Sequence, residues 1–212
     1  MAADDFPTGF FDRQDERDDA DFYGPPRLVT HIDDGAIAAV TALYDELGVP
    51  EGRVLDLMSS WVSHLSRRPD GGLVALGMNA AELAANPMAE ATVVQDLNRD
   101  PRLPFEDAAF DAVTCCVSID YLVRPVEVLR EVERVLRPGG VVVLTFSNRC
   151  FPTKAIRAWL FTDEEGRVTI VRAYLERAGF ADVSTALRTD PGAAGDPLYA
   201  AWGRVGRADR SR

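Results

Sequence analysis

The fold of this chain is decided by Phe105-Glu-Asp-Ala-Ala-Phe-Asp-Ala-Val-Thr-Cys-Cys116, together with Leu136-Arg-Pro-Gly-Gly140 and the apolar run that follows to Phe146. A polar turn leads into an apolar strand, and an amphipathic helix over residues 125–136 leads through a tight Pro-Gly-Gly turn into a second apolar strand. Continuous apolar strands joined by a helix are typical of neighbouring parallel strands in a doubly wound sheet, because helices cover both faces of such a sheet.

The rest of the chain continues this alternation of strands and helices. We predict further strands over residues 53–57, 73–77, 92–95, 183–187 and 198–202, and helices over residues 33–47, 80–85, 153–161 and 165–178, with a short helix in the loop that ends at Leu65. This order predicts an α/β three-layer sandwich. Its sheet would be Rossmann-like, doubly wound and mostly parallel, with seven strands and an antiparallel last strand.

Length and composition indicate one folded domain. The chain has 212 residues, of which 47% are hydrophobic, and this is enough for a substantial core. It has no apolar run of about 18 residues and begins with acidic residues, so we expect neither a membrane span nor a secretory signal. Its cysteines, Cys115, Cys116 and Cys150, lack metal-ligand spacing. We therefore expect a cytoplasmic protein without a bound metal.

The formal net charge is −11, and residues 1–23 hold 8 acidic residues against 2 arginines. We interpret these residues as an acidic segment that precedes a single domain over residues 24–212. Two interpretations of the segment remain open: a flexible tail, or a lid that orders over a ligand through Phe6, Phe10, Phe11 and Phe22. The acidic balance disfavours a nucleic-acid partner, because phosphate binding needs a basic face.

A third strand, Val54-Leu-Asp-Leu57, ends in an acidic residue and a short loop. With the stretches quoted above, it resembles the class I S-adenosylmethionine-dependent methyltransferases of the type 11 methyltransferase domain family, over residues 53–148. The resemblance implies S-adenosylmethionine as cofactor, bound beyond the carboxyl ends of the strands. The family's glycine-rich loop after the first strand is replaced here by Asp56-Leu-Met-Ser-Ser-Trp-Val-Ser-His64. Positive backbone angles are costly without glycine, so we expect the loop to follow a different path.

The resemblance also implies individual cofactor contacts. Asp56 matches the acid that faces the sulfonium end, Asn79 stands where the family has an acid for the ribose, and Asp96 with Leu97 matches the adenine contact. Each polar residue also has a structural interpretation: a strand-end cap, a helix N-cap and a turn, respectively. The other predicted cofactor contacts are Met58, Ser59, Ser60, Trp61, His64 and Cys116.

On the acceptor side, Asp120 and Tyr121 stand where many members of the family have a histidine pair. A carboxylate beside a phenol can orient or deprotonate an acceptor, and His31 is a further candidate base. Arg149 and Lys154 would hold an anionic acceptor. Asp120 as a loop cap and the histidines as structural residues are the alternatives.

These observations favour a methyltransferase that acts on a small polar or anionic acceptor, with no nucleic-acid or membrane partner. Two alternatives are an enzyme that uses a sulfonium cofactor for other chemistry, and a cofactor-free binding or regulatory protein on the same fold. The sequence names neither the acceptor nor an oligomeric state.

Overall fold

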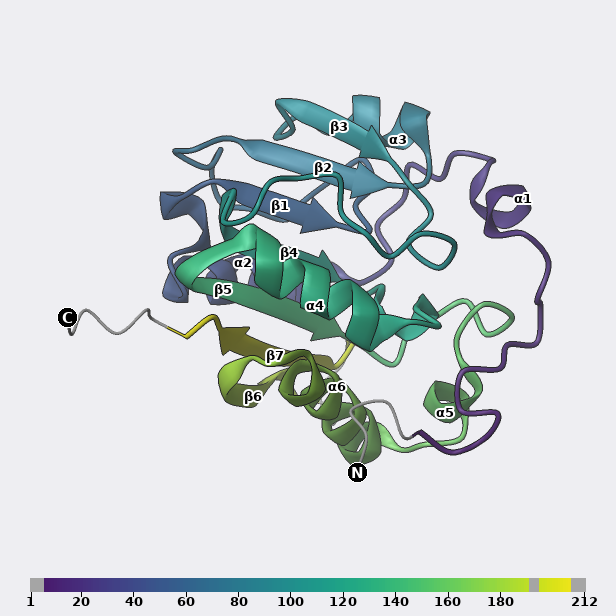
Figure 1. Cartoon of the computed structure of the whole chain (residues 1–212). Coiled ribbons are helices and arrows are strands. Elements are labelled where there is room, and N and C mark those ends of the chain that lie inside the picture. The colour runs from purple at the N-terminus through teal and green to yellow at the C-terminus, as the bar shows by residue number, and fades with distance from the viewer. Residues whose placement is uncertain (1–5, 191–194, 207–212) are drawn as a thin grey trace.

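The strands of the sheet lie in the order β3-β2-β1-β4-β5-β7-β6 in the computed structural model, which describes residues 6–190 and 195–206 (Figure 1). The strands are β1 (Val54–Leu57), β2 (Leu73–Gly77), β3 (Ala91–Val94), β4 (Phe110–Cys116), β5 (Leu136–Phe146), β6 (Ala181–Thr189) and β7 (Leu198–Arg204). The first five pair in parallel, and β7 pairs antiparallel with both of its neighbours. The predicted seven-stranded, mostly parallel sheet is confirmed.

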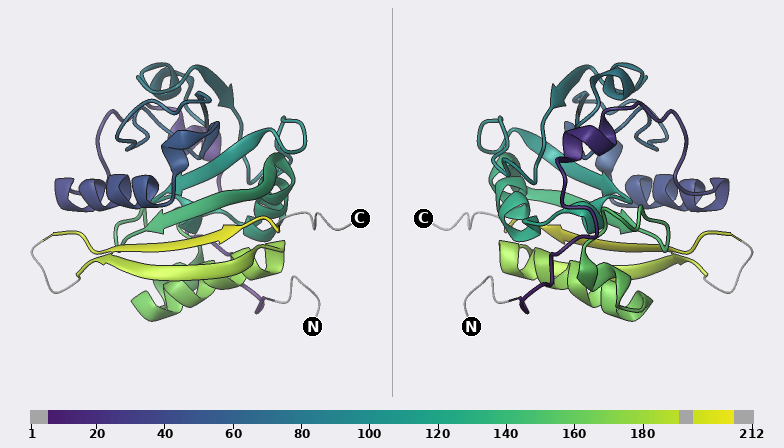
Figure 2. Two further views of the ribbon diagram at one scale, coloured as in Figure 1. Left: turned by 90° about the vertical axis from the view of Figure 1, so that its left-hand side faces the viewer. Right: turned by 90° about the vertical axis from the view of Figure 1, so that its right-hand side faces the viewer.

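Helices cover both faces of this sheet (Figures 1 and 2). They are α1 (Asp19–Tyr23), α2 (Asp34–Glu46), α3 (Ala80–Ala84), α4 (Pro125–Val135), α5 (Arg157–Leu160) and α6 (Glu164–Ala178), with 3-10 turns η1 (Val49–Glu51) and η2 (Ile119–Tyr121). α4 and α6 pack on each other on one face, and α2 and α3 lie on the other, so two apolar clusters form the core. Over the described residues, no helix combines the length and apolar character that a bilayer span needs.

Local signals explain where the longer helices begin and end. Asp33 caps α2 by accepting from the amide of Ala36, and Asp163 caps α6 by accepting from the amide of Gly166. α6 ends at Gly179, whose φ of 103° suits a residue without a Cβ. In β4 and β5 the central residues are buried on both faces, as their continuous apolar sequence predicts.

Three predicted local structures differ from the observed ones. The helix predicted over residues 153–161 is limited to Arg157–Leu160. The Pro-Gly-Gly turn lies within β5, where the pairing with β4 shifts register and Gly139 has φ 84°. The short helix predicted to end at Leu65 is absent from the described loop. Met58 and His64 there have φ of 54° and 50°. Left-handed backbone at these two positions is incompatible with a right-handed helical turn.

Residues 6–33, the N-terminal strap, run along the edge of the sheet at which the parallel strands end (Figure 2, right). The strap begins beside α6, where Phe6 and Phe11 pack on Tyr174. Its backbone then bonds to the segment before α5 and to α5 itself: the amide of Asp15 donates to the carbonyl of Thr153, at 2.9 Å. The strap therefore covers the edge of the sheet at which the parallel strands end.

Candidate functional site

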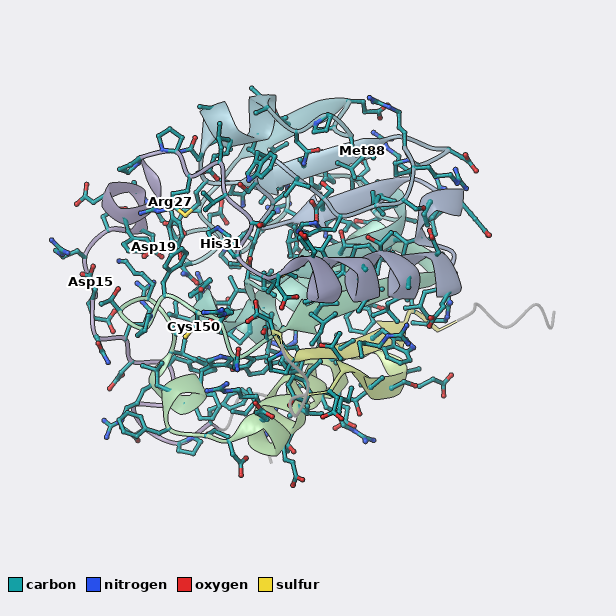
Figure 3. All side chains as sticks on the ribbon, turned by 180° about the vertical axis from the view of Figure 1, so that it is seen from behind. Asp15, Asp19, Arg27, His31, Met88 and Cys150 are labelled. Carbon is teal, nitrogen blue, oxygen red and sulfur yellow. The ribbon has the colours of Figure 1, made fainter. Side chains whose placement is uncertain are left out.

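A cavity of about 270 Å³ lies beyond the carboxyl ends of β1, β2, β3 and β4. One wall comes from the last residues of β2 and from the loops that follow these strands, residues 58–60, 76–79, 95–98 and 117–118. The opposite wall comes from the strap and from residues 149–151 after β5. This is the edge at which open parallel sheets bind ligands. Figure 3 places Asp19, Arg27, His31 and Cys150, which all line the cavity, on the same side of the molecule.

The loop after β1 is held from beneath by Asp56. The Asp56 carboxylate is buried and accepts from the hydroxyls of Ser59 and Ser63, each at 2.6 Å, and of Thr114, at 2.8 Å. Burial raises the pKa of Asp56, and the three hydrogen bonds oppose this rise. Hydroxyl groups therefore order a loop that has no glycine.

The walls of the cavity contain backbone in rarely used conformations. Met58 has φ 54° and Val117 has φ 45°, so a β-branched residue adopts left-handed backbone. Gly77, at the end of β2, is required by a close approach of the β1 loop: a Cβ there would lie 2.2 Å from the carbonyl oxygen of Ser59. The loop keeps its positive φ values without glycine and packs tightly on the end of β2. Strained backbone of this kind clusters at ligand sites.

Asn79 connects the end of β2 to the strap. Its side-chain oxygen accepts from the amides of Ala81 and Glu82 at the start of α3, as the N-cap interpretation predicts. Its side-chain nitrogen donates to the carbonyls of Tyr23 (3.0 Å) and Gly24 (2.8 Å) in the strap. The position predicted to meet the ribose is therefore engaged with the chain's own backbone.

Glu82 makes a second connection to the strap. One oxygen accepts from the amide of Arg27 at 2.6 Å, and the other accepts from the hydroxyl of Ser60 at 2.6 Å. The start of α3, the loop after β1 and the strap are thus joined at one corner of the cavity.

Asp96 and Leu97 lie at the end of β3 and line the cavity. One oxygen of Asp96 accepts from the amides of Asn98 (2.9 Å) and Arg99 (3.3 Å), so the carboxylate also forms the turn that was its structural interpretation. The next residue, Asn98, joins three parts of the site. Its amide group donates to Asp19 in the strap and to the carbonyl of Tyr121, and its oxygen accepts from the amide of Val123.

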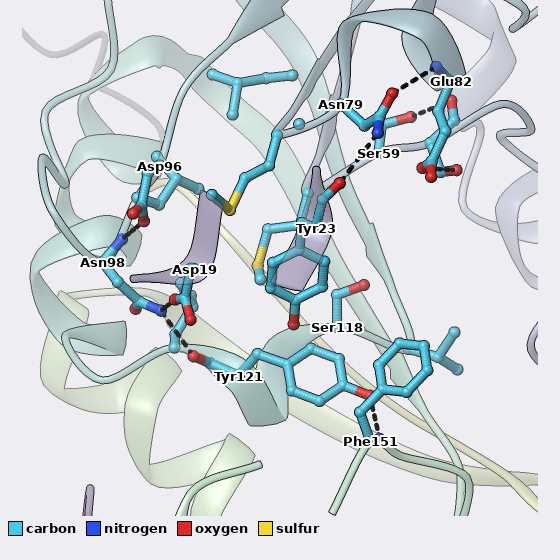
Figure 4. Close-up of a pocket in the computed structure, with 18 of the residues that line it drawn as sticks. Asp19, Tyr23, Ser59, Asn79, Glu82, Asp96, Asn98, Ser118, Tyr121 and Phe151 are labelled. Carbon is cyan, nitrogen blue, oxygen red and sulfur yellow. Dashed lines mark hydrogen bonds between the residues drawn. The ribbon is translucent and has the colours of Figure 1, made fainter. Parts of the chain in front are cut away.

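One end of the larger cavity is formed by three aromatic residues, Tyr23, Tyr121 and Phe151 (Figure 4). The hydroxyl oxygen of Tyr121 accepts from the amide of Phe151 at 2.8 Å. The Tyr23 hydroxyl is buried and has no hydrogen-bond partner among the described residues. Burial raises the pKa of both tyrosines well above the usual value, so both remain protonated at neutral pH.

Lys154 lies away from the cavity. It is fully buried, and its Nζ donates to the carbonyls of Asp15 (3.2 Å) and Arg17 (2.8 Å) in the strap. Its Nζ also lies 3.0 Å from the carboxylate of Asp19, which Arg13 contacts at 2.8 Å. Because the strap surrounds the ammonium group, Lys154 lines neither cavity and is not placed to hold an anionic acceptor there.

Asp120 also lies outside both cavities. Its side chain is buried, one oxygen has no hydrogen-bond partner among the described residues, and burial raises its pKa to about 8. It differs from its predicted position at the acceptor because η2 turns the carboxylate into the protein interior. Arg149 does line the cavity, and its guanidinium bonds to Asp196 at 2.7 Å.

A smaller cavity of about 60 Å³ lies on the other side of the β1 loop. His31 lines both cavities, and His64 lines the smaller one. Burial lowers the pKa of His64, and the nearby His31 acts in the same direction. Burial raises the pKa of Cys116, in the same wall, to about 12, so this thiol is not a thiolate at neutral pH. Among the residues described, no cluster of side chains suits a metal ion.

The predicted site residues thus divide into three groups. Those that line the larger cavity are His31, Met58, Ser59, Ser60, Asn79, Asp96, Leu97, Tyr121 and Arg149. Those that line only the smaller cavity are Asp56, Trp61, His64 and Cys116. Asp120 and Lys154 line neither.

Sequence reasoning missed Tyr23, Arg27, Glu82 and Asn98, which all line the larger cavity. Asn98 directly follows the predicted adenine contact, Asp96 with Leu97, so its position at the end of the same strand could have indicated that it lines the cavity. Tyr23 and Arg27 lie in the strap, where the sequence carries no signal for which loops it crosses.

Comparisons with known proteins agree with this geometry. Residues 47–144 match the sequence family described as a methyltransferase domain. Over 151 residues the chain is 35% identical to demethylmenaquinone methyltransferase of Mycolicibacterium paratuberculosis. The matched region covers 69% of this chain and 59% of that protein. The chain thus spans about three fifths of the length of this curated relative.

Solved structures share the fold at low sequence identity. A methyltransferase of Aquifex aeolicus, described as S-adenosylmethionine-dependent, superposes with a TM-score of 0.59 at 15% identity, over 81% of this chain and 91% of that one. The [4+2]-cyclase SpnF superposes with a TM-score of 0.56 at 17% identity, over 87% of this chain and 90% of that one. At these identities the likeness concerns the fold alone.

Proposed function

We propose that the protein transfers a methyl group from S-adenosylmethionine to a small polar or anionic acceptor, because residues 47–144 match the methyltransferase domain family. The observation that carries the proposal is the cavity at the carboxyl ends of four parallel strands, with Asp96 in its wall. S-adenosylmethionine is the cofactor that such a domain implies, as the sequence predicted.

The residues at two ends of the cavity fit this cofactor. At the end of β3, Asp96 has a carboxylate oxygen that can accept from the exocyclic amine of adenine, and the buried side chain of Leu97 offers an apolar surface to the ring. At the end of β1, Ser59 and Ser60 line both cavities and flank the space for the amino-acid end. The buried Tyr23 hydroxyl without a partner supports a polar ligand in the larger cavity.

The ribose position imposes a condition on binding. Asn79 and Glu82 bond to the strap through Tyr23, Gly24 and Arg27. A ribose whose hydroxyls bond to Asn79 or Glu82 has to replace the bonds that these side chains make to the strap. Cofactor binding and the position of the strap are therefore coupled.

When bound, the cofactor supplies an electrophilic methyl group: the acceptor's electron pair forms the new bond, the carbon–sulfur bond breaks with its pair retained on sulfur, and S-adenosylhomocysteine leaves. The chain's own residues orient the acceptor and exclude water. His31 lines the cavity and is the residue we assign to remove an acceptor proton. Arg27 and Arg149 line the same cavity and favour an acceptor with a polar or anionic group.

Calorimetric titration with S-adenosylmethionine and S-adenosylhomocysteine tests the proposal. We expect both to bind, and ligand at about 100 times its Kd to stabilise the fold by about 2.7 kcal/mol. Asp96→Ala should weaken both. Asp100→Ala is the matched control, because Asp100 forms a similar turn with the amide of Arg102 and does not line the cavity.

Transfer of labelled methyl then separates the possible activities. Binding with transfer to a small acceptor supports a methyltransferase. Binding without transfer to any acceptor in a broad panel favours other sulfonium chemistry. Absence of binding would refute the proposal and favour a binding protein on this fold.

A further inference from the structure

Two hydroxyl protons at one end of the larger cavity have no acceptor among the described residues. The Tyr23 hydroxyl is buried without any partner. The Tyr121 oxygen accepts from the amide of Phe151, which leaves its own proton to be donated elsewhere. A phenol has one donor proton, and buried donors are nearly always satisfied in native proteins. Both residues line the cavity, and Figure 4 shows the Tyr23 hydroxyl directed towards the side chains of Ser118 and Tyr121.

The same end of the cavity has aromatic walls. The ring centroids of Tyr23 and Tyr121 lie 6.4 Å apart, and those of Tyr121 and Phe151 lie 5.9 Å apart. No hydrogen bond joins the two tyrosine hydroxyls. Aromatic faces and edges around a space favour a flat, aromatic occupant.

The charges around the two tyrosines favour an oxygen acceptor rather than a cation. Burial raises the pKa of both tyrosines, so both hydroxyls stay protonated at neutral pH and serve as hydrogen-bond donors. Asp19, the acidic side chain of the strap in this wall, is already bound by Arg13, Asn98 and Lys154.

The other acidic side chains of the cavity are also engaged. Glu82 accepts from Arg27 and Ser60, and Asp96 accepts in its turn. Arg27 and Arg149 line the same space; the Arg27 guanidinium also donates to the carbonyls of Pro25 and Phe22, and the Arg149 guanidinium bonds to Asp196. A ligand oxygen with negative charge suits these surroundings better than an ammonium group does.

We infer that this end of the cavity, the tyrosine end (Tyr23, Tyr121 and Phe151), binds an aromatic alcohol through its oxygen, with the hydroxyls of Tyr23 and Tyr121 as donors. The inference names the acceptor class of the proposed methyltransferase and rests on that function for its catalytic meaning. Binding of the aromatic alcohol itself can be measured without the cofactor.

The probe is 4-nitrophenol, because its phenolate absorbs at longer wavelength than its phenol and so reports how the oxygen is bound. We expect saturable binding to the full chain, with a spectral shift towards the phenolate. Nitrobenzene, which lacks the hydroxyl, should bind at least tenfold more weakly, since it cannot offer the two tyrosines a phenolate oxygen.

Tyr23→Phe and Tyr121→Phe should each weaken 4-nitrophenol binding by about tenfold or more and reduce the spectral shift. Tyr174→Phe is the matched control: its hydroxyl is also buried without a partner among the described residues, but it does not line the cavity. It should leave binding unchanged. Unchanged far-ultraviolet circular dichroism and thermal midpoint would show that the variants keep the fold.

Three results would overturn the inference: no binding of 4-nitrophenol, equal binding of nitrobenzene, or full binding by both cavity variants. Titration of the same protein with S-adenosylmethionine keeps this outcome separate from the proposed function. Cofactor binding without 4-nitrophenol binding would refute only the aromatic acceptor. Binding of 4-nitrophenol without cofactor binding would support the tyrosine end and refute the methyltransferase.

Discussion

The ammonium group of Lys154 and the carboxylate of Asp19 lie 3.0 Å apart, and each side chain is at most 3% exposed. Lys154 follows β5 and Asp19 begins α1 in the strap. This buried pair, with Arg13 as a second cation, fastens the strap across the strand ends. The only lysine of the sequence is therefore a structural residue.

Lys154→Met should lower the free energy of unfolding by about 3 kcal/mol, because removal of one partner leaves a buried charge less well compensated. Chemical denaturation measures the change. Arg172→Met is the control, since its ion pair with Glu176 is exposed and should contribute less than about 1 kcal/mol. Equal effects of the two substitutions would contradict the role given to Lys154.

Asp120→Asn should stabilise the protein more as pH rises. Burial raises the pKa of Asp120 from 3.8 to about 8, so between these values the folded state binds more protons than the unfolded state, and stability falls as pH increases. The asparagine variant lacks this loss. We expect it to match the wild type near pH 4 and to be more stable by a few kcal/mol near pH 8, as measured by urea denaturation. Parallel pH profiles would contradict the raised pKa.

Ser63→Ala should destabilise the loop after β1. The Ser63 hydroxyl donates to Asp56 and accepts from the side-chain amide of Asn86, both in buried surroundings. Loss of the hydroxyl removes one hydrogen bond from Asp56 and one from Asn86, which should lower the free energy of unfolding by about 1–3 kcal/mol. Ser66→Ala removes an exposed hydroxyl bonded to Asp45 and should change stability by less than about 0.5 kcal/mol. The comparison requires only thermal or urea denaturation of both variants.

Gly77→Ala should push the β1 loop away from the end of β2, because the new Cβ would lie 2.2 Å from the Ser59 carbonyl oxygen. We expect a destabilisation of about 1–3 kcal/mol and a loss of cofactor affinity in calorimetry. Gly206→Ala adds the same methyl group where no atom lies within 4 Å. A Gly77 variant that binds the cofactor as well as the Gly206 variant does would show that this close approach is unimportant.

The sequence was sufficient for the sheet and for the edge where the site lies. Val54–Leu57, Phe110–Cys116 and the run to Phe146 are apolar enough to be buried strands, and parallel strands end at a common edge. Polar residues that follow parallel strands at this edge, such as Ser59 after β1 and Asp96 after β3, therefore reach one cavity.

Partner choice within the site was not predictable in this way. Asn79 bonds to Tyr23, 56 positions earlier, and Lys154 bonds to Asp15, 139 positions earlier. No periodicity or spacing encodes such pairs, because they depend on the path of a strap that has little regular structure. The loop after β1 shows the same limit. It has no glycine and is ordered by three hydroxyls that donate to Asp56: those of Ser59 and Ser63 in the loop itself and that of Thr114 in β4.

The path of the strap has a consequence for how the protein is made. Some of the groups to which residues 6–33 bond, at Thr153, Lys154 and Arg157, are synthesised more than a hundred residues after the strap itself. Contacts this distant in sequence close large loops, and closing them costs conformational entropy. The outer wall of the cavity therefore cannot be complete before residues 153–157 have been synthesised.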